Sequence, residues 1–239
     1  MINWQIYALP ETSSTNDAIK EYCNQKGQYV ALRAVKQTAG RGRLGRKWQS
    51  LDGNLFFSMA LEIPLKNLGM LIVCASLSLW QTIKKMQPSA SVCLKWPNDV
   101  LLNGAKVSGM LLEKGSDEYI IIGIGVNIVQ HPDSAEMLYP TTSLAKAGIN
   151  TTAQDFMMQY LQQFSHNFER MQNGEEALLR QQWTACAKGV GRKISVRQGQ
   201  TEQIGIFKGI DENAHLLLEK ENEICHIRVG DVFYIEKEI

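Results

Sequence analysis

The sequence predicts an α+β fold: a mixed β-sheet with helices over residues 1–188, then a small all-β domain over residues 189–239. Two observations lead to this prediction. Strand-like and helical patterns are interspersed as far as residue 188. The pattern changes at Gly189-Val-Gly191, after which short strands recur at the close spacing of a β-barrel of about fifty residues. A chain of 239 residues has room for one sizeable core and such an appended domain.

Helices are expected in four places in the larger domain, where apolar residues recur at helical spacing. They run from Ser13–Asp17 to Gly27, from Asn67 to Met86, from Thr152 to Met171 and from Glu175 to Ala187. The segment Ser13–Asp17 supplies N-cap residues and an acidic first turn, and Pro88 follows the second helix. We interpret the apolar stripe of the third helix as core packing.

Strands are expected where β-branched and aromatic residues lie between turn signals. In the larger domain they are Tyr29–Val35, Leu55–Glu62, Ser91–Trp96, Val107–Glu113 and Tyr119–Val126. In the smaller domain they are Ile194–Val196, Ile204–Ile210, Leu216–Leu218, Ile224–Ile227 and Val232–Ile235. Gly209 and the segment Asp211–Asn213 are expected in turns between these strands.

Composition narrows the class of protein. The net charge of +1 and pI of about 7.6 give no general basic field, so a nucleic-acid partner is not expected. Five cysteines without a C-x-x-C pair argue against a zinc site or a disulfide framework and suit the reducing cytoplasm. The N-terminus resembles no signal peptide, and the longest apolar run, Leu68–Leu79, is too short to cross a membrane. We therefore expect a soluble cytoplasmic protein without a membrane partner.

The segment Gln37–Trp48 carries the strongest functional signal. Three glycines (Gly40, Gly42, Gly45) alternate with three arginines (Arg41, Arg43, Arg46), and Lys47 follows. Glycine allows a backbone to approach a ligand closely, and the clustered cations repel one another unless an anion lies among them. The segment therefore predicts a loop that closes over a phosphate or carboxylate and is mobile without one, because its charges lack partners. An arginine-glycine surface loop that contacts nucleic acid is the alternative.

Two familiar phosphate motifs nearly match this loop, and neither fits. Gly40, Gly42 and Gly45 have the G-x-G-x-x-G spacing of a dinucleotide site, but the residues that follow indicate a turn and a strand instead of the required helix. The spacing also suits a Walker A loop. There, however, Arg46 occupies the lysine position and Lys47 the Ser/Thr position, so the hydroxyl that binds Mg²⁺ is missing.

A second group of polar residues follows the sequence Lys95-Trp-Pro-Asn-Asp99. Asn103-Gly104 predicts a two-residue hairpin turn, which pairs Leu102 with Ala105 and Leu101 with Lys106. Strict alternation then places four side chains on one face: Asp99, Leu101, Lys106 and Ser108. The carboxylate and the ammonium could serve one polyanionic ligand, although a surface ion pair is an equally good interpretation. Gly109 and the sequence Gly123-Ile-Gly125-Val-Asn127 are weaker signals of a ligand beside the sheet.

In order and spacing, these segments resemble the biotin protein ligase family. The matching residues are Ser14-Thr15-Asn16, Gln37 ahead of GRGRLGRKW, KWPNDV, Lys106 with Gly109, and GIGVN. The resemblance implies a biotin/lipoate ligase-like catalytic domain followed by a small SH3-like β-barrel. It also implies a reaction in two steps: biotin and ATP form biotinoyl-5′-AMP and pyrophosphate, and biotin then passes to a lysine of a biotin carboxyl carrier protein or domain.

The same resemblance implies roles for individual residues. Biotin-binding positions are Ser14, Thr15, Asn16, Gln37, Arg41, Gly42, Arg43, Lys106 and Gly109. Positions for ATP or the adenylate are Arg41, Arg43, Trp48, Asn98, Lys106 and Asn127. We expect Lys106 and Arg43 to offset the repulsion between a carboxylate and the α-phosphate, and Asp99 to orient the acceptor amine or take its proton. Mg²⁺ is expected with ATP, held mainly by the phosphates, with no metal bound by protein ligands alone.

Some members of the family carry an N-terminal helix-turn-helix domain and repress biotin-synthesis genes. Because the first matching motif begins near Ser13, we expect a ligase without DNA-binding activity, either as a monomer or as a homodimer. Two alternatives remain. A lipoate ligase would use the same adenylation chemistry, and a non-catalytic module could bind anions or nucleic acid through the arginine-glycine loop.

Overall fold

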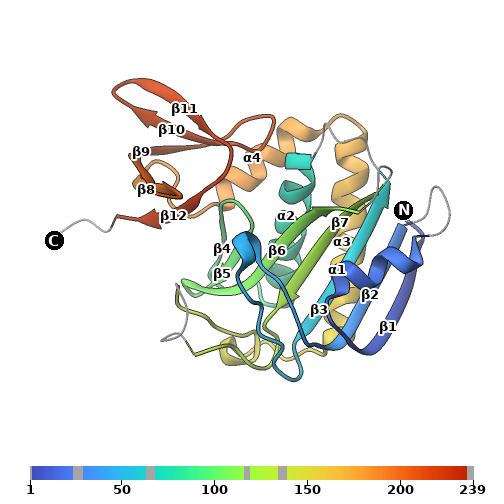
Figure 1. Cartoon of the computed structure of the whole chain (residues 1–239). Coiled ribbons are helices and arrows are strands. Elements are labelled where there is room, and N and C mark those ends of the chain that lie inside the picture. The colour runs from blue at the N-terminus through green and yellow to red at the C-terminus, as the bar shows by residue number, and fades with distance from the viewer. Residues whose placement is uncertain (1, 24–28, 63–67, 116–118, 134–138, 236–239) are drawn as a thin grey trace.

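The computed structural model describes residues 2–23, 29–62, 68–115, 119–133 and 139–235. The larger part is built on a seven-stranded mixed sheet with the order β1-β2-β3-β7-β6-β5-β4 (Figure 1). Its strands are β1 (Trp4–Thr12), β2 (Tyr29–Gln37), β3 (Leu55–Glu62), β4 (Val92–Lys95), β5 (Asp99–Leu102), β6 (Ala105–Lys114) and β7 (Tyr119–Val126). Only the β1–β2 pair among these described strands is parallel, and the others are antiparallel.

The three longer helices cover one face of this sheet (Figure 1). The longer helices are α2 (Leu68–Met86), α3 (Ala153–Gln172) and α4 (Glu176–Cys186). Their apolar faces, including Tyr160 and Phe164, are fully buried against sheet residues such as Phe57. Thr152 caps α3, because its side chain accepts a hydrogen bond from the N–H of Asp155 at 3.0 Å. The apolar stripe is thus core packing, as the sequence indicates.

The opposite face has a smaller apolar cluster beside a short helix. This helix, α1 (Thr15–Ala18), continues as a 3₁₀ turn over Ile19–Tyr22, so it is more irregular than its sequence predicts. Ser14 occupies the N-cap position without a capping side-chain hydrogen bond. Ile19 packs on Val30 and Leu32, which point away from the main core because side chains alternate along β2. The expected helix boundaries at Gly27 and Asn67 lie outside the described residues.

The first strand, β1, was not anticipated from the sequence. It is an edge strand that alternates between half-buried and exposed positions, and Pro10 lies near its end. Such a strand gives a weak apolar signal, and its proline is tolerated because one side of the strand forms no ladder. The parallel pairing with β2 places the end of β1 beside Gln37, where the arginine-glycine segment begins.

The second sheet is antiparallel, with the order β11-β10-β9-β8-β12. Its strands are β8 (Lys193–Gln198), β9 (Thr201–Ile210), β10 (Leu216–Lys220), β11 (Glu223–Ile227) and β12 (Asp231–Tyr234), which confirms the predicted all-β segment. A β11–β12 ladder that would close a barrel is not among the pairings of these described strands. The boundary at residues 188 and 189 stays a prediction, because apolar residues such as Phe207 and Leu218 belong to the same buried cluster as the larger sheet.

The β5–β6 hairpin has the predicted turn and one unpredicted bulge. Leu102 pairs with Ala105 and Leu101 with Lys106, as the Asn-Gly signal indicates. The register then shifts, so that Ser108 pairs with Val100 and Gly109 with Asp99. The expectation that Ser108 shares the face of Asp99 and Lys106 is therefore wrong, because the bulge replaces it there with Gly109.

Among the described helices, none is long and apolar enough to span a bilayer.

Candidate functional site

A cavity of about 380 Å³ lies on the sheet face opposite α2 and α3. Its walls come from the loop between β2 and β3, from α1, from β4 to β7 and from the start of β12. It brings together nearly all of the residues singled out in the sequence, from segments far apart in the chain. These are Ser14, Thr15, Asn16, Gln37, Arg41, Gly42, Arg43, Trp48, Asn98, Asp99, Lys106 and Gly109.

One end of the cavity is lined by uncharged polar side chains, which a hydrogen-bond network joins to one another and to the carboxylate of Glu113 behind them. Gln37 Oε1 accepts hydrogen bonds from Thr15 N–H at 2.8 Å and from Thr15 Oγ1 at 3.1 Å. Ser58 Oγ lies 2.8 Å from Thr15 Oγ1 and 2.6 Å from Asn16 Oδ1. Asn16 Nδ2 donates to Glu113 Oε2 at 2.7 Å. These bonds fix the orientation of each side chain, so the end is prepared for a ligand with its own neutral donors and acceptors.

Sequence reasoning missed two members of this network, Ser58 and Glu113. Ser58 is fully buried in the middle of β3, where all of its neighbours in the strand interior are apolar. A hydroxyl in the middle of an apolar strand was an available signal, because buried polar groups need hydrogen-bond partners. Glu113 gave no comparable signal, since a glutamate near the end of a strand is usually solvated.

The two glycines of β7 form the floor of the cavity. A Cβ atom on Gly123 would lie 2.2 Å from Asn16 Oδ1, and one on Gly125 would lie 2.3 Å from the indole of Trp48. Residues two apart in a strand share a face, so both glycines open the same side of the sheet. The G-x-G sequence, weak evidence by itself, therefore has a steric reason: each glycine makes room for a predicted site residue.

The arginine-glycine segment crosses the cavity, and its arginines have protein partners. Arg41 Nη2 lies 3.0 Å from Asp17 Oδ1 and 3.3 Å from Glu113 Oε2. Arg46 Nη2 lies 2.6 Å from Asp231 Oδ2 in the second sheet. The premise that the charges of this loop lack partners is therefore wrong. The carboxylates that pair with them lie far away in the sequence, where spacing gave no hint of them.

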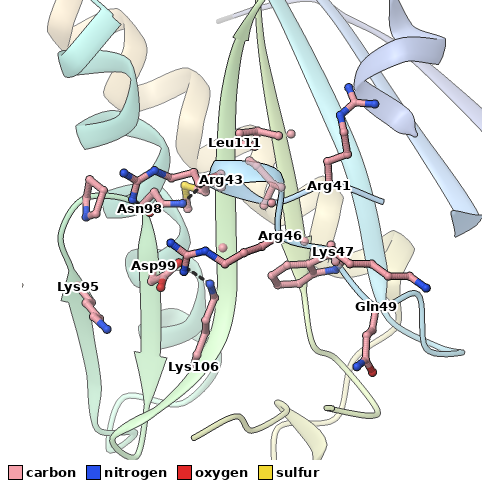
Figure 2. A pocket seen from close by; sticks show the side chains of 18 of the residues that line it. Arg41, Arg43, Arg46, Lys47, Gln49, Lys95, Asn98, Asp99, Lys106 and Leu111 are labelled. Atoms are coloured by element: carbon pink, nitrogen blue, oxygen red, sulfur yellow. Dashed lines mark hydrogen bonds and ion pairs between the residues drawn. The ribbon is translucent and has the colours of Figure 1, made fainter. Parts of the chain in front are cut away.

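The third arginine of this loop, Arg43, is the most enclosed. Its Nη1 donates to Asn98 Oδ1 at 3.2 Å and faces the carbonyl of Gly230 at 3.5 Å. Burial lowers the pKa of Arg43, although the charges of Asp231 and Asp99 oppose this effect. In Figure 2, Arg43 and Arg46 extend toward Asn98 and Asp99, whereas Arg41 extends away from them. Arg43 thus has donors available to an anion inside the cavity.

Lys106 and Asp99 form an ion pair across the bulged hairpin. Lys106 Nζ lies 2.7 Å from Asp99 Oδ1 and 5.6 Å from the ring centroid of Trp48. Figure 2 shows both side chains directed into the cavity, below the arginines. A Cβ atom on Gly109 would lie 3.0 Å from Lys106 Nζ, so the glycine leaves room for the ammonium at this position. The pair is only 21% and 12% exposed, so it is not the fully solvated surface pair that was the alternative interpretation.

Lys95 is a further cation that sequence reasoning did not select. Only 5% of the residue is exposed, and its Nζ lies 3.0 Å from the ring centroid of Tyr139. Burial lowers the pKa of Lys95 to about 8, and the charge of Asp99 opposes the shift. Lys95 ends a short strand before Trp-Pro. Nothing in the local sequence indicates that Tyr139, from a distant loop, covers it.

Asn127 is placed apart from the other predicted site residues. It is 3% exposed and is absent from the lining of the cavity. Its Nδ2 donates to the carbonyl of Thr142 at 3.0 Å, and its N–H donates to the carbonyl of Val107 at 2.8 Å. In this structure it therefore holds the chain around Thr142 against β6, beside Lys106. Its contact with a nucleotide stays a prediction.

Comparisons with known proteins agree on one family. Residues 8–127 match the model of the Biotin/lipoate A/B protein ligase family. A biotin–[acetyl-CoA-carboxylase] ligase of Paracoccus denitrificans is 32% identical over 95% of this chain and 99% of the relative. The bifunctional ligase/repressor BirA of Bacillus subtilis is 32% identical over 92% of this chain and 71% of the relative. The structure of Aquifex aeolicus biotin protein ligase with biotin and ATP has a TM-score of 0.84 and 30% identity, and the match covers 96% of this chain and 97% of that one.

The buried ammonium of Lys95 should make stability depend on pH. Its pKa is about 8 when folded and near 10.5 when unfolded, so the unfolded chain binds more protons between these values and stability rises with pH there. Urea unfolding of the wild type and Lys95→Met should show the wild type gaining up to about 3 kcal/mol on the variant over this range. A difference in unfolding free energy that does not change with pH would contradict the shifted pKa.

Proposed function

Since the chain belongs to the Biotin/lipoate A/B protein ligase family, we propose that it is an ATP-dependent biotin protein ligase. In the first step, an oxygen of the biotin carboxylate attacks the α-phosphorus of ATP, and the bond to pyrophosphate breaks. In the second step, a lysine amine of the acceptor protein attacks the carbonyl carbon, and AMP leaves. The observation that carries the proposal is a single cavity in which an uncharged hydrogen-bonding end adjoins a cationic end.

The uncharged end suits the fused rings of biotin. Their ureido group has a carbonyl acceptor and two N–H donors, which require neutral partners of both kinds. Thr15, Asn16 and Gln37 offer such partners, and Ser58 holds two of them in position. The glycines of β7 let Asn16 and Trp48 lie close against the sheet, where they border the space proposed for the ring. This end therefore selects a neutral polar ring, and the valeryl chain would extend from it toward Lys106.

The cationic end suits the adenylation step. A carboxylate and a triphosphate repel each other, so catalysis requires fixed positive charge where negative charge develops. Lys106 is positioned by Asp99 at 2.7 Å, and Arg43 approaches from the loop side with its donors oriented by Asn98. We assign Lys106 to the reacting carboxylate and α-phosphate and Arg43 to the phosphates. Lys95, at the same end, adds a further positive charge.

The arginine-glycine segment acts as a cover over the adenylate. It is anchored to α1 and β6 through Arg41 and to β12 through Arg46, so it bridges the cavity from one sheet to the other. Within it, Gly42 N–H donates to the carbonyl of Arg46 at 2.7 Å, which closes a tight loop. A mixed anhydride hydrolyses when water reaches it, so a cover of this kind preserves the intermediate until the acceptor arrives.

In the transfer step, the incoming lysine amine must lose a proton. Asp99 is the carboxylate nearest the proposed reaction centre, and its side chain is 12% exposed beside Lys106. We assign to it the orientation of the amine and the acceptance of its proton. The acceptor is proposed to be a lysine of a biotin carboxyl carrier protein or domain. We propose that the reaction takes place in the cytoplasm and involves neither nucleic acid nor a membrane.

Mg²⁺ would accompany ATP. Among the described residues that line the cavity, the acidic side chains are Asp99 and Asp231, and each is already paired with a cation. Magnesium accepts few protein ligands and keeps several waters, so this donor set fits an ion bound mainly through the phosphates. Its contribution when bound would be to neutralise the charge of the departing pyrophosphate.

Isotope exchange between pyrophosphate and ATP tests the proposed function. Purified protein should catalyse exchange when biotin is added but not when lipoate is added, and Lys106→Met should reduce the rate by at least about a hundredfold. Exchange with lipoate alone would retain the chemistry and replace the substrate. A folded protein that supports exchange with neither compound, and whose RNA or DNA binding falls steeply with salt, would be a binding module instead.

Gly123→Ala should affect biotin and leave ATP binding nearly unchanged. The added methyl group would overlap Asn16 Oδ1 and displace this side chain from the polar network. We expect the KM for biotin to rise by at least about tenfold, because hydrogen-bonding groups around the ring lose their alignment. The KM for ATP should change by less than about twofold. Equal increases in both constants would mean that the cavity is not divided as proposed.

Arg43→Ala should loosen retention of the adenylate. Loss of a charge-assisted contact to phosphate costs about 1.5–3 kcal/mol, so release of biotinoyl-AMP into the filtrate should increase at least about tenfold. Arg197→Ala, which removes an exposed arginine from the second sheet, is the matched control. If Arg43→Ala releases biotinoyl-AMP at the wild-type rate, Arg43 does not contact the phosphate.

A further inference from the structure

Outside the cavity, three side chains of the second sheet converge on one point. Asp211 follows β9, His215 precedes β10, and His226 lies in β11. Their ligand atoms all lie within 4.8 Å of one another. The Nδ1 atoms of His215 and His226 lie 3.1 Å and 2.6 Å from the same oxygen, Asp211 Oδ2. The proposed biotin ligase reaction uses none of the three.

The carboxylate at the centre of this cluster is held by the backbone. Asp211 Oδ1 accepts hydrogen bonds from the N–H groups of Asn213 at 2.9 Å and His215 at 2.8 Å. Only Oδ2 therefore remains for the two imidazoles. The carboxylate is thus oriented by the main chain, with one oxygen directed at both imidazoles.

We infer that Asp211, His215 and His226 form a binding site for a divalent transition-metal ion of the zinc type. One carboxylate oxygen and two imidazole nitrogens are ligands that zinc accepts, and three protein ligands leave a fourth position for water. To bind, each imidazole would carry its proton on Nε2, so that Nδ1 presents its lone pair. The oxygen ligands that Mg²⁺ and Ca²⁺ prefer are scarce here, so the site should discriminate against both.

The two distances from the imidazoles to Asp211 Oδ2 are close to those of a zinc site, and the ligand atoms as a whole lie within 4.8 Å of one another. Bonds of about 2.0–2.1 Å in a tetrahedron place ligand atoms about 3.3 Å apart. His215 Nδ1 is already near this separation from Asp211 Oδ2, at 3.1 Å, and His226 Nδ1, at 2.6 Å, must move outward by about 0.7 Å. The side chain of His226 is 53% exposed, so it has room for this movement, and an ion can reach the cluster from solvent.

The cluster also adjoins the contact between the two sheets. The carbonyl of Ala214, between two of the proposed ligands, accepts a hydrogen bond from Trp96 Nε1 at 3.0 Å. A Cβ atom on Gly69 of α2 would lie 2.0 Å from the carbonyl oxygen of Asn213, so this turn packs closely on the helix. A bound ion would therefore brace the turn that packs against the larger sheet, and binding should stabilise the folded chain.

Metal titration of the full chain, freed of metal by a chelator, tests the inference. Zn²⁺ should bind one to one and raise the Tm, whereas Mg²⁺ should leave the Tm unchanged. His215→Gln and His226→Gln should each weaken Zn²⁺ binding by at least about tenfold, and the double variant should lose both binding and the rise in Tm. His166→Gln, which replaces an exposed histidine on α3, is the matched control and should bind as the wild type does.

Co²⁺ separates this site from the cysteines of the chain. Binding at the cluster should give the visible absorption of tetrahedral Co²⁺ without the near-ultraviolet band of a thiolate ligand. Three outcomes would overturn the inference: a thiolate band at stoichiometric Co²⁺, Zn²⁺ binding that persists in the double variant, or no Zn²⁺ binding at micromolar concentrations by the folded wild type. The third outcome would mean that the cluster is a hydrogen-bonded Asp–His group only.

Discussion

Two missing side chains on β7 determine where a ligand can lie on this protein. Any residue larger than glycine at positions 123 or 125 would collide with Asn16 or with the indole of Trp48. The space above Gly123 holds Asn16, which belongs to the polar end of the cavity. The space above Gly125 holds Trp48, which ends the arginine-glycine segment. Because Gly123 and Gly125 are on adjacent outward positions of one central strand, these two features meet above the same part of the sheet. The sheet thus defines the site before any charge is considered.

Electrostatics then divide the cavity. Arg43, Lys95 and Lys106 concentrate at one end, while Asp99 and Asp231 compensate only part of their charge. Burial disfavours the ionised forms of Arg43 and Lys95, as the lowered pKa values of both indicate. An incoming polyanion would relieve this cost. The same physics explains why the loop, though rich in arginine, is tied down: Arg41 and Arg46 have carboxylate partners, and Arg43, between them, retains donors toward the cavity.

Much of this arrangement was predictable from local sequence signals. The ends of β3 and β7 and the Asn103-Gly104 turn came from periodicity and turn chemistry, which act over a few residues. The bulge in β6, at Val107 opposite Val100 and Leu101, was not predictable, because it depends on how β6 pairs with β7 as well as with β5. Similarly, Ser58, Glu113 and Lys95 acquire their roles only from partners distant in the chain. The local sequence around a single polar residue does not indicate which distant residues will contact it.

A crystal structure with biotin and a non-hydrolysable ATP analogue would show whether one cavity holds a neutral ring at one end and phosphates at the other. We predict that the ureido ring contacts Thr15, Asn16 and Gln37 above Gly123, and that the biotin carboxylate and the α-phosphate meet at Lys106. Arg43 should contact phosphate oxygens. A complex with the ring beside Arg43 and Tyr139 and the phosphates against Asn16 would rule out this division of the cavity. Two ligands whose reacting atoms lie far from Lys106 would rule out the role proposed for that lysine.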